Sequence, residues 1–68
     1  MKNKLKVARA EMDFTQEELA KRIGVSRQTI NAIEVGKYVP STVLALKMAK
    51  LFGKNVEELF FLEDSDFD

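Results

Sequence analysis

The sequence predicts a small all-α domain with five short helices, and three observations support this fold class. Apolar residues recur three and four positions apart, glycines and capping residues divide the chain into helix-sized segments, and no segment shows the strict alternation typical of a half-buried strand. A chain of 68 residues suffices for one domain with a modest core. We expect this domain to span residues 1–62 and an acidic C-terminal tail to occupy residues 63–68.

The apolar residues form five groups, one for each expected helix. In chain order the groups are Leu5, Ala8 and Met12; Leu19, Ala20 and Ile23; Ile30 and Ile33; Leu44, Met48, Leu51 and Phe52; and Val56, Leu59 and Phe60. Residues three or four apart lie on the same side of a helix, so each group predicts one buried helical face. The expected helices are separated by residues 13–15, by Gly24, by residues 36–40 and by Gly53.

Residues before the expected helices can satisfy the backbone amides that a helix start leaves free. Thr15 and Glu18 have the spacing of a capping box, in which each side chain accepts a hydrogen bond from the backbone of the other residue. Capping residues also precede the third, fourth and fifth helices: Ser26, Ser41 and Asn55. The three glycines of the chain stand where a helix commonly ends on a left-handed residue. The helix boundaries are therefore marked by local sequence.

The charge of the chain is zero overall, but it is unevenly divided. All 11 lysines and arginines lie in residues 1–54 together with five acidic residues, so this part carries a net charge of +6. Residues 55–68 contain six acidic residues and no basic one, which gives −6. This asymmetry indicates a cationic binding face followed by an acidic tail. The alternative is a solvated surface with an ordinary acidic terminus.

The sequence lacks the groups that most enzymes and metal sites use. It contains no cysteine and no histidine, which removes disulfides, thiolate and imidazole metal ligands, and a histidine base. The adjacent acids at 17–18 and 57–58 point in different directions on a helix and suit first turns, where acids favour the helix dipole. We therefore expect no enzyme, no metal and no cofactor. Because no apolar run is long enough to span a membrane, the composition predicts a cytoplasmic protein.

The second and third expected helices are separated by little more than Gly24-Val25-Ser26. Ala20 is small and stands where the third helix must approach closely, and Val25 and Ile30 can fill the corner between the two helices. This combination predicts the tight turn of a helix-turn-helix. Such a turn holds two helices steeply crossed, so that the second can lie in the major groove of DNA.

The third helix, about residues 27–35, has an outward face suited to reading bases. Ile30 and Ile33 point inward on a helical wheel. The outward positions carry Gln28, Asn31, Ala32 and Val35, with Arg27 and Thr29 on the flanks. Arginine pairs with guanine, glutamine and asparagine pair with adenine, and small apolar side chains contact the thymine methyl group. The alternative is an ordinary exposed polar face, although the Glu–Lys pairs typical of such faces are absent here.

Residues 15–41, TQEELAKRIGVSRQTINAIEVGKYVPS, closely resemble the phage-repressor-like helix-turn-helix family, also described as xenobiotic-response-element-like or Cro/C1-type. With the flanking helices the resemblance covers about residues 3–62. It implies a five-helix domain that binds a specific double-stranded DNA site with its third helix. We expect a transcriptional regulator, more specifically a repressor. The resemblance suggests no small-molecule effector, because family members with an effector domain are longer.

The resemblance also implies roles for individual residues. It places base contacts on the third helix at Arg27, Gln28, Thr29, Asn31 and Ala32. It places contacts with the DNA backbone at Gln16, Ser26, Gly36, Lys37 and Tyr38, the loop after the third helix acting through its amides and a basic side chain. Arg9 and Glu34 match an arginine and a glutamate that form an ion pair in family members. From the residues alone, Tyr38 can either donate to a phosphate or pack on Pro40.

One short domain reads few base pairs, and repressor-like domains compensate by pairing on a palindromic operator. We therefore expect a homodimer. Phe60, Phe61 and Leu62 are consecutive and cannot all face one core from a helix, so we expect them to supply the dimer contact. The alternatives are a folded monomer with a disordered tail, or an antitoxin-type protein-interaction module that covers a basic partner and binds its own operator.

Overall fold

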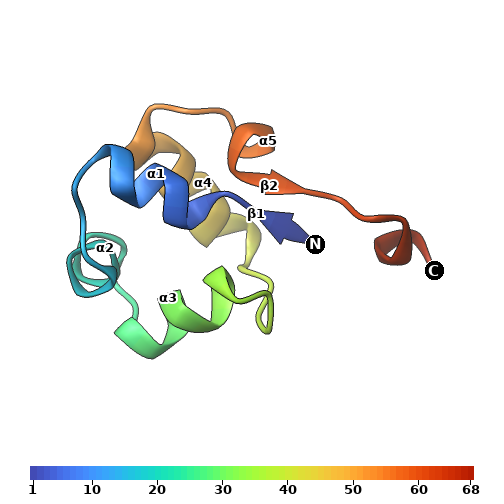
Figure 1. The fold of residues 1–68 in the computed structure, drawn as a ribbon, viewed down its shortest axis with the longest axis horizontal. Coiled ribbons are helices and arrows are strands. Elements are labelled where there is room, and N and C mark those ends of the chain that lie inside the picture. The colour runs from blue at the N-terminus through green and yellow to red at the C-terminus, as the bar shows by residue number, and fades with distance from the viewer.

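The computed structural model describes all 68 residues, and its five α-helices confirm the predicted helical fold (Figure 1). The helices are α1 Leu5–Glu11, α2 Gln16–Ile23, α3 Arg27–Glu34, α4 Thr42–Phe52 and α5 Val56–Leu59. Two short strands, β1 Lys2–Asn3 and β2 Phe60–Phe61, and a 3₁₀-helix, η1 Asp64–Phe67, complete the chain. No helix is both long and apolar enough to cross a membrane.

The two strands are the main departure from the predicted all-α fold. They pair antiparallel with Lys2 opposite Phe61, and the backbone amide of Lys4 donates to the carbonyl of Leu59 at 2.8 Å. The fifth helix therefore ends at Leu59, and Phe60, which the apolar pattern assigns to that helix, begins a strand. Strands this short show no alternation, so the sequence carries no strand signal here.

One hydrophobic core of 12 buried residues holds the helices together, and every helix contributes to it. The core consists of Leu5, Ala8, Leu19, Ala20, Ile23, Ile30, Ile33, Met48, Ala49, Phe52, Leu59 and Phe60. The prediction that Met12 belongs to the buried face of the first helix is wrong. Met12 follows α1 as its C-cap, and it is 44% exposed because the chain has already turned away from the core.

The predicted N-terminal caps of α2, α3 and α4 are confirmed. Thr15 Oγ1 accepts from Glu18 N at 3.0 Å while the Glu18 carboxylate accepts from Thr15 N at 3.3 Å, which completes the capping box. The hydroxyl groups of Ser26 and Ser41 accept from the third amides of α3 and α4 at 3.1 and 3.2 Å. At α5 the Glu58 carboxylate accepts from the backbone amide of the capping asparagine at 2.8 Å. The helix starts thus follow local sequence signals.

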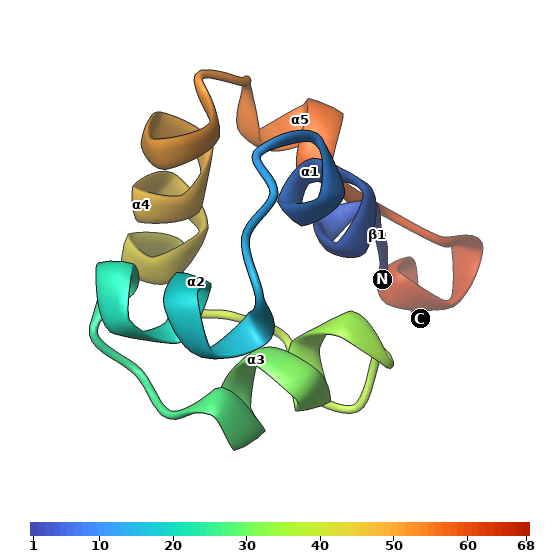
Figure 2. The ribbon, with the colours of Figure 1, turned by 60° about the vertical axis from the view of Figure 1, so that its left-hand side comes forward.

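Helix α3 lies along one edge of the molecule, with α5 at the opposite edge (Figures 1 and 2). The N-terminus of the chain lies beside the tail. The ammonium group of Met1 is 3.0 Å from Glu63 Oε1 and 3.2 Å from Asp66 Oδ1. These hydrogen bonds raise the pKa of the amine, and a backbone hydrogen bond at Glu63 together with the amine lowers the pKa of Asp66. The expected acidic tail therefore forms one helical turn that is tied to the start of the chain.

Replacement of Ile30 by alanine should destabilise the domain strongly. Ile30 is fully buried between α3 and the core, and its truncation should cost about 2–5 kcal/mol through lost burial and a residual cavity. Val35→Ala, at the C-terminal end of the same helix, serves as the control. Because Val35 is 58% exposed, truncating its side chain should change the free energy of unfolding by about 0.5 kcal/mol or less. Urea unfolding followed by circular dichroism measures both. Equal midpoints would contradict the core position of Ile30.

Candidate nucleic-acid interface

The turn between α2 and α3 has the geometry that a helix-turn-helix needs. Gly24 ends α2 in the left-handed region at φ 78°, where a side chain would be strained. The amides of Gly24 and Val25 both donate to the carbonyl of Ala20, at 2.9 and 3.0 Å, which closes the end of α2. Ala20 itself is 3% exposed and belongs to the core. Only three residues therefore separate the end of α2 from the start of α3 at Arg27.

The outer face of α3 combines free and engaged polar groups. Arg27, Gln28 and Asn31 are exposed, and Ala32 is half-buried beside them. Thr29 differs from the other predicted base-reading residues, because its hydroxyl lies 2.9 Å from the Ser26 hydroxyl at the start of the helix. A hydroxyl engaged at the cap is less available to a base edge. The sequence-predicted face is thus present, with Arg27 and Gln28 as its free polar ends.

The loop after α3 uses its backbone amides inside the protein. Gly36 N donates to Ile33 O at 3.0 Å, and the amides of Lys37 and Tyr38 donate to Ala32 O at 2.9 and 3.2 Å. These amides, for which the resemblance implies a phosphate contact, thus already have acceptors within the protein and close the C-terminal end of α3. Only the side chains of Lys37 and Tyr38 remain free for such a contact, and Tyr38 is 47% exposed.

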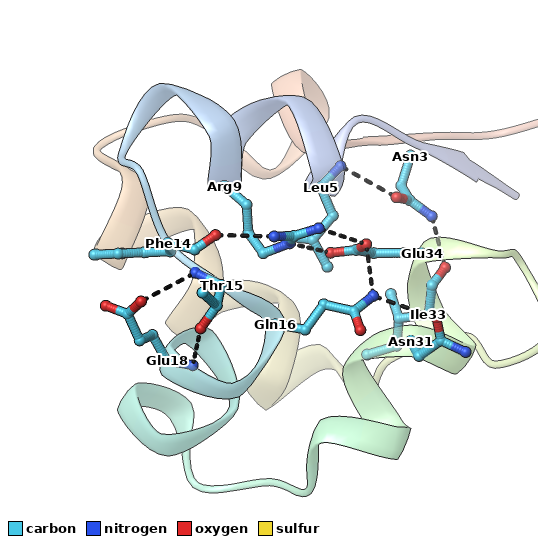
Figure 3. Close-up of polar contacts among 10 residues, drawn as sticks. All are labelled: Asn3, Leu5, Arg9, Phe14, Thr15, Gln16, Glu18, Asn31, Ile33 and Glu34. Atoms are coloured by element: carbon cyan, nitrogen blue, oxygen red, sulfur yellow. Dashed lines mark hydrogen bonds and ion pairs between the residues drawn. The ribbon is translucent and has the colours of Figure 1, made fainter.

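Arg9 and Glu34 form a bidentate ion pair between α1 and the end of α3 (Figure 3). Arg9 Nε donates to Glu34 Oε2 at 2.6 Å and a terminal nitrogen donates to Oε1 at 3.1 Å. The other terminal nitrogen donates to the carbonyl of Phe14 at 2.8 Å, which also ties down the loop before α2. The side chains are only 15% and 5% exposed, and the hydrogen bonds to Glu34 raise the pKa of Arg9.

Asn3 is a second tether that sequence reasoning missed. Its Nδ2 donates to the carbonyl of Ile33 at 2.8 Å, and its Oδ1 accepts from the amide of Leu5 at 3.1 Å (Figure 3). The bond to Leu5 follows a local pattern that an asparagine before a helix can indicate. The bond to Ile33 joins residues 30 positions apart and has no local signal. Asn3 therefore connects strand β1 to the last turn of α3.

The residues predicted for the dimer contact do not share one surface. Phe60 is 7% exposed and belongs to the core, so it offers little surface for the expected dimer contact. Phe61 is half-buried, and the Lys4 ammonium lies 5.4 Å from its ring centre. Leu62 alone is well exposed, at 67%. Strand β2 ends at Phe61, so its alternation separates Phe60 from Phe61, and Leu62 lies beyond the strand.

Removal of the Glu34 carboxylate should be costly. Glu34→Ala leaves the guanidinium of Arg9 nearly buried without its partner, and we expect a loss of about 3–5 kcal/mol in unfolding free energy. Glu17→Ala is the control, since Glu17 forms an exposed pair with Lys21 at 3.9 Å that should contribute about 1 kcal/mol or less. Thermal and urea unfolding would measure both. Similar small shifts for the two variants would mean that the Arg9–Glu34 pair behaves as a surface contact.

Known proteins share both the sequence and this geometry. The profile of the helix-turn-helix family matches residues 5–59. A protein of Methanocaldococcus jannaschii named as an HTH-type transcriptional regulator is 61% identical over 66 residues, which cover 97% of this chain and 100% of the relative. The transcriptional repressor RstR of the cryptic phage CTXphi, from Vibrio cholerae, is 35% identical over 66 residues, which cover 97% of this chain and 60% of RstR.

Solved structures agree with these relatives. The SOS-response transcriptional repressor LexA from Eubacterium rectale superposes with a TM-score of 0.77 at 33% identity, over 94% of this chain and 68% of that one. A Bacteroides fragilis protein proposed to bind DNA also reaches a TM-score of 0.77 at 33% identity, over 85% of this chain and 94% of that one. The tight turn, the exposed third helix and these similarities lead to one conclusion: the chain belongs to the Cro/C1-type helix-turn-helix family of DNA-binding transcriptional regulators.

Proposed function

We propose that the protein binds a specific site in double-stranded DNA with α3 in the major groove and represses transcription by occupying that site. The observation that carries the proposal is an exposed recognition face on a helix whose end is held by a bidentate, nearly buried ion pair. A helix fixed in this way can present base-reading groups without first being ordered by the DNA. Two similar proteins, RstR and LexA, are named as transcriptional repressors, which supports repression over activation.

The contacts divide by chemistry. Arg27, Gln28 and Asn31 have polar groups that can pair with base edges, and Ala32 can meet a thymine methyl group. Lys37 and the Tyr38 hydroxyl are the groups suited to phosphate after α3. At the start of α2 the first two backbone amides have no acceptor within the helix, so they can also donate to a phosphate. The phosphate contacts provide salt-sensitive affinity, and the side chains of α3 provide sequence preference.

Two alanine substitutions separate these roles. Gln28→Ala should remove a base contact of about 1–3 kcal/mol at the preferred site and leave nonspecific binding nearly unchanged. Lys37→Ala should weaken all duplexes about equally and reduce the slope of log affinity against log salt by about one unit. Fluorescence anisotropy with selected and scrambled duplexes at several salt concentrations measures both. The same sequence-independent loss for both variants would rule out α3 as the reading element.

We further propose that the protein pairs with a second copy to bind a palindromic site. A strip of exposed apolar residues runs from the loop before α4 onto that helix: Val39, Val43 and Leu46, which are 60%, 65% and 57% exposed. It borders a shallow apolar hollow of about 230 Å³ that Pro40 and Phe60 also line. An isolated domain reads few base pairs, so a second copy on this strip would give the site its required length.

Sedimentation equilibrium tests the dimer. We expect the wild type to dimerise in the micromolar range and Leu46→Ser to remain monomeric, because the change removes apolar contact from the strip. Val7→Ser is a matched control, since Val7 on α1 is 56% exposed and lies outside the strip. It should dimerise like the wild type. The proposal fails if the wild type stays monomeric at every concentration and binds a half-site as tightly as a palindrome.

A further inference from the structure

Lys47 on α4 makes a long-range contact with the end of α2. Its ammonium group donates a hydrogen bond to the backbone carbonyl of Ile23 at 3.0 Å, across 24 positions of the chain. Ile23 is the last residue of α2, so no later amide of that helix can donate to its carbonyl. The amides of Gly24 and Val25 both donate to Ala20 instead. Lys47 therefore supplies a hydrogen bond that this carbonyl would otherwise lack.

The position of the contact strengthens it. The donor is charged, and charge-assisted hydrogen bonds are stronger than neutral ones. The C-terminal end of a helix also carries a partial negative charge, which attracts a cation. None of the ion pairs of the domain involves Lys47, so no carboxylate competes with the carbonyl for its ammonium group. Because the contact is partly buried, its loss would leave the Ile23 carbonyl poorly satisfied.

Helix α2 connects α3 to α4 (Figure 2). It packs against both helices, and it is the main helical neighbour of α3. The direction of α3 relative to α4 is therefore transmitted through α2 and the turn that follows it. Lys47 links α4 to the last residue of α2, where that turn begins. Leu46, which precedes Lys47 in the chain, belongs to the exposed apolar strip through which we propose that the protein dimerises.

We propose that Lys47 is a positioning residue that holds the helix-turn-helix at a fixed angle to α4, and thereby sets the spacing of the two half-sites in the DNA. This inference rests on the proposed function, because it requires base reading by α3 and dimerisation through the strip on α4. In such a dimer, each α3 reaches its half-site only at the distance and rotation that α4 and α2 define. One additional base pair moves the second half-site by about 3.4 Å and rotates it by about 34°, so a rigid dimer binds the altered site poorly.

Palindromic duplexes with altered spacing test the proposal. The site is first selected from random duplexes with the wild type, and one base pair is then added or removed between the half-sites. We expect the wild type to lose about tenfold in affinity on the altered duplexes. Lys47→Met keeps the length of the side chain but cannot donate, so it should lose only about twofold to threefold on them. Fluorescence anisotropy measures the affinities at a temperature at which circular dichroism shows that each variant is folded.

Matched variants separate the hydrogen bond from the charge. Lys50→Met removes the same charge from an exposed position on the same helix, and it should keep the spacing preference of the wild type. Lys47→Arg retains a charged donor, and it should also keep that preference. Lys47→Gln is uncharged and shorter by one bond, and it replaces Lys47→Met if the methionine variant does not fold.

The possible outcomes are distinct. An equally sharp spacing preference in the wild type and in Lys47→Met would overturn the inference. It would also be overturned by a uniform loss on every duplex, with a slope of log affinity against log salt that is lower by about one unit, because Lys47 would then be a phosphate contact. A wild type that binds a half-site as tightly as a palindrome would remove the proposed dimer, and the inference with it.

Discussion

The ion pair between Arg9 and Glu34 is the interaction on which the rest of the binding face depends. Helix α3 has eight residues and buries only Ile30 and Ile33, so apolar contact alone leaves its direction weakly defined. The guanidinium of Arg9 donates two hydrogen bonds to the Glu34 carboxylate and a third to the backbone carbonyl of Phe14 in the loop before α2. A buried ion pair adds little stability over an apolar contact, but its bidentate geometry sets a direction. The ion pair therefore defines the direction of α3 more than it adds to stability.

The polar residues on this side of α3 consequently fall into two classes. Thr29 and Asn31 are tied to neighbouring groups of the protein, whereas Arg27 and Gln28 have free polar ends. A side chain that is already hydrogen-bonded within the protein loses less conformational entropy on binding, and it has fewer orientations in which to meet a base. Free groups can adapt to more bases. The outer face of α3 therefore combines side chains with a fixed orientation and side chains that can still reorient.

The short sheet formed by β1 and β2 affects how deeply the consecutive apolar residues near the C-terminus are buried. It turns Phe60 into the core and leaves Phe61 half-buried under Lys4, whereas Leu62 follows the strand and is exposed. A continuous helix would have distributed them differently. The strip of exposed apolar residues lies instead on α4 and the loop before it, a region whose sequence resembles an ordinary helix start.

The sequence by itself determined the helices, their caps and the turn between α2 and α3. Those features depend on hydrogen bonds and contacts between residues a few positions apart, such as Thr15 with Glu18. Tertiary structure alone decided which side chains on the outer face of α3 are hydrogen-bonded within the protein. It also decided which amides of the loop after α3 have internal acceptors, and how strands β1 and β2 pair. The contacts responsible, such as Asn3 with Ile33 and Gln16 with Asn31, join residues 30 and 15 positions apart. Such contacts form only after the helices pack, because no local pattern in the chain specifies the distance or the angle between two helices.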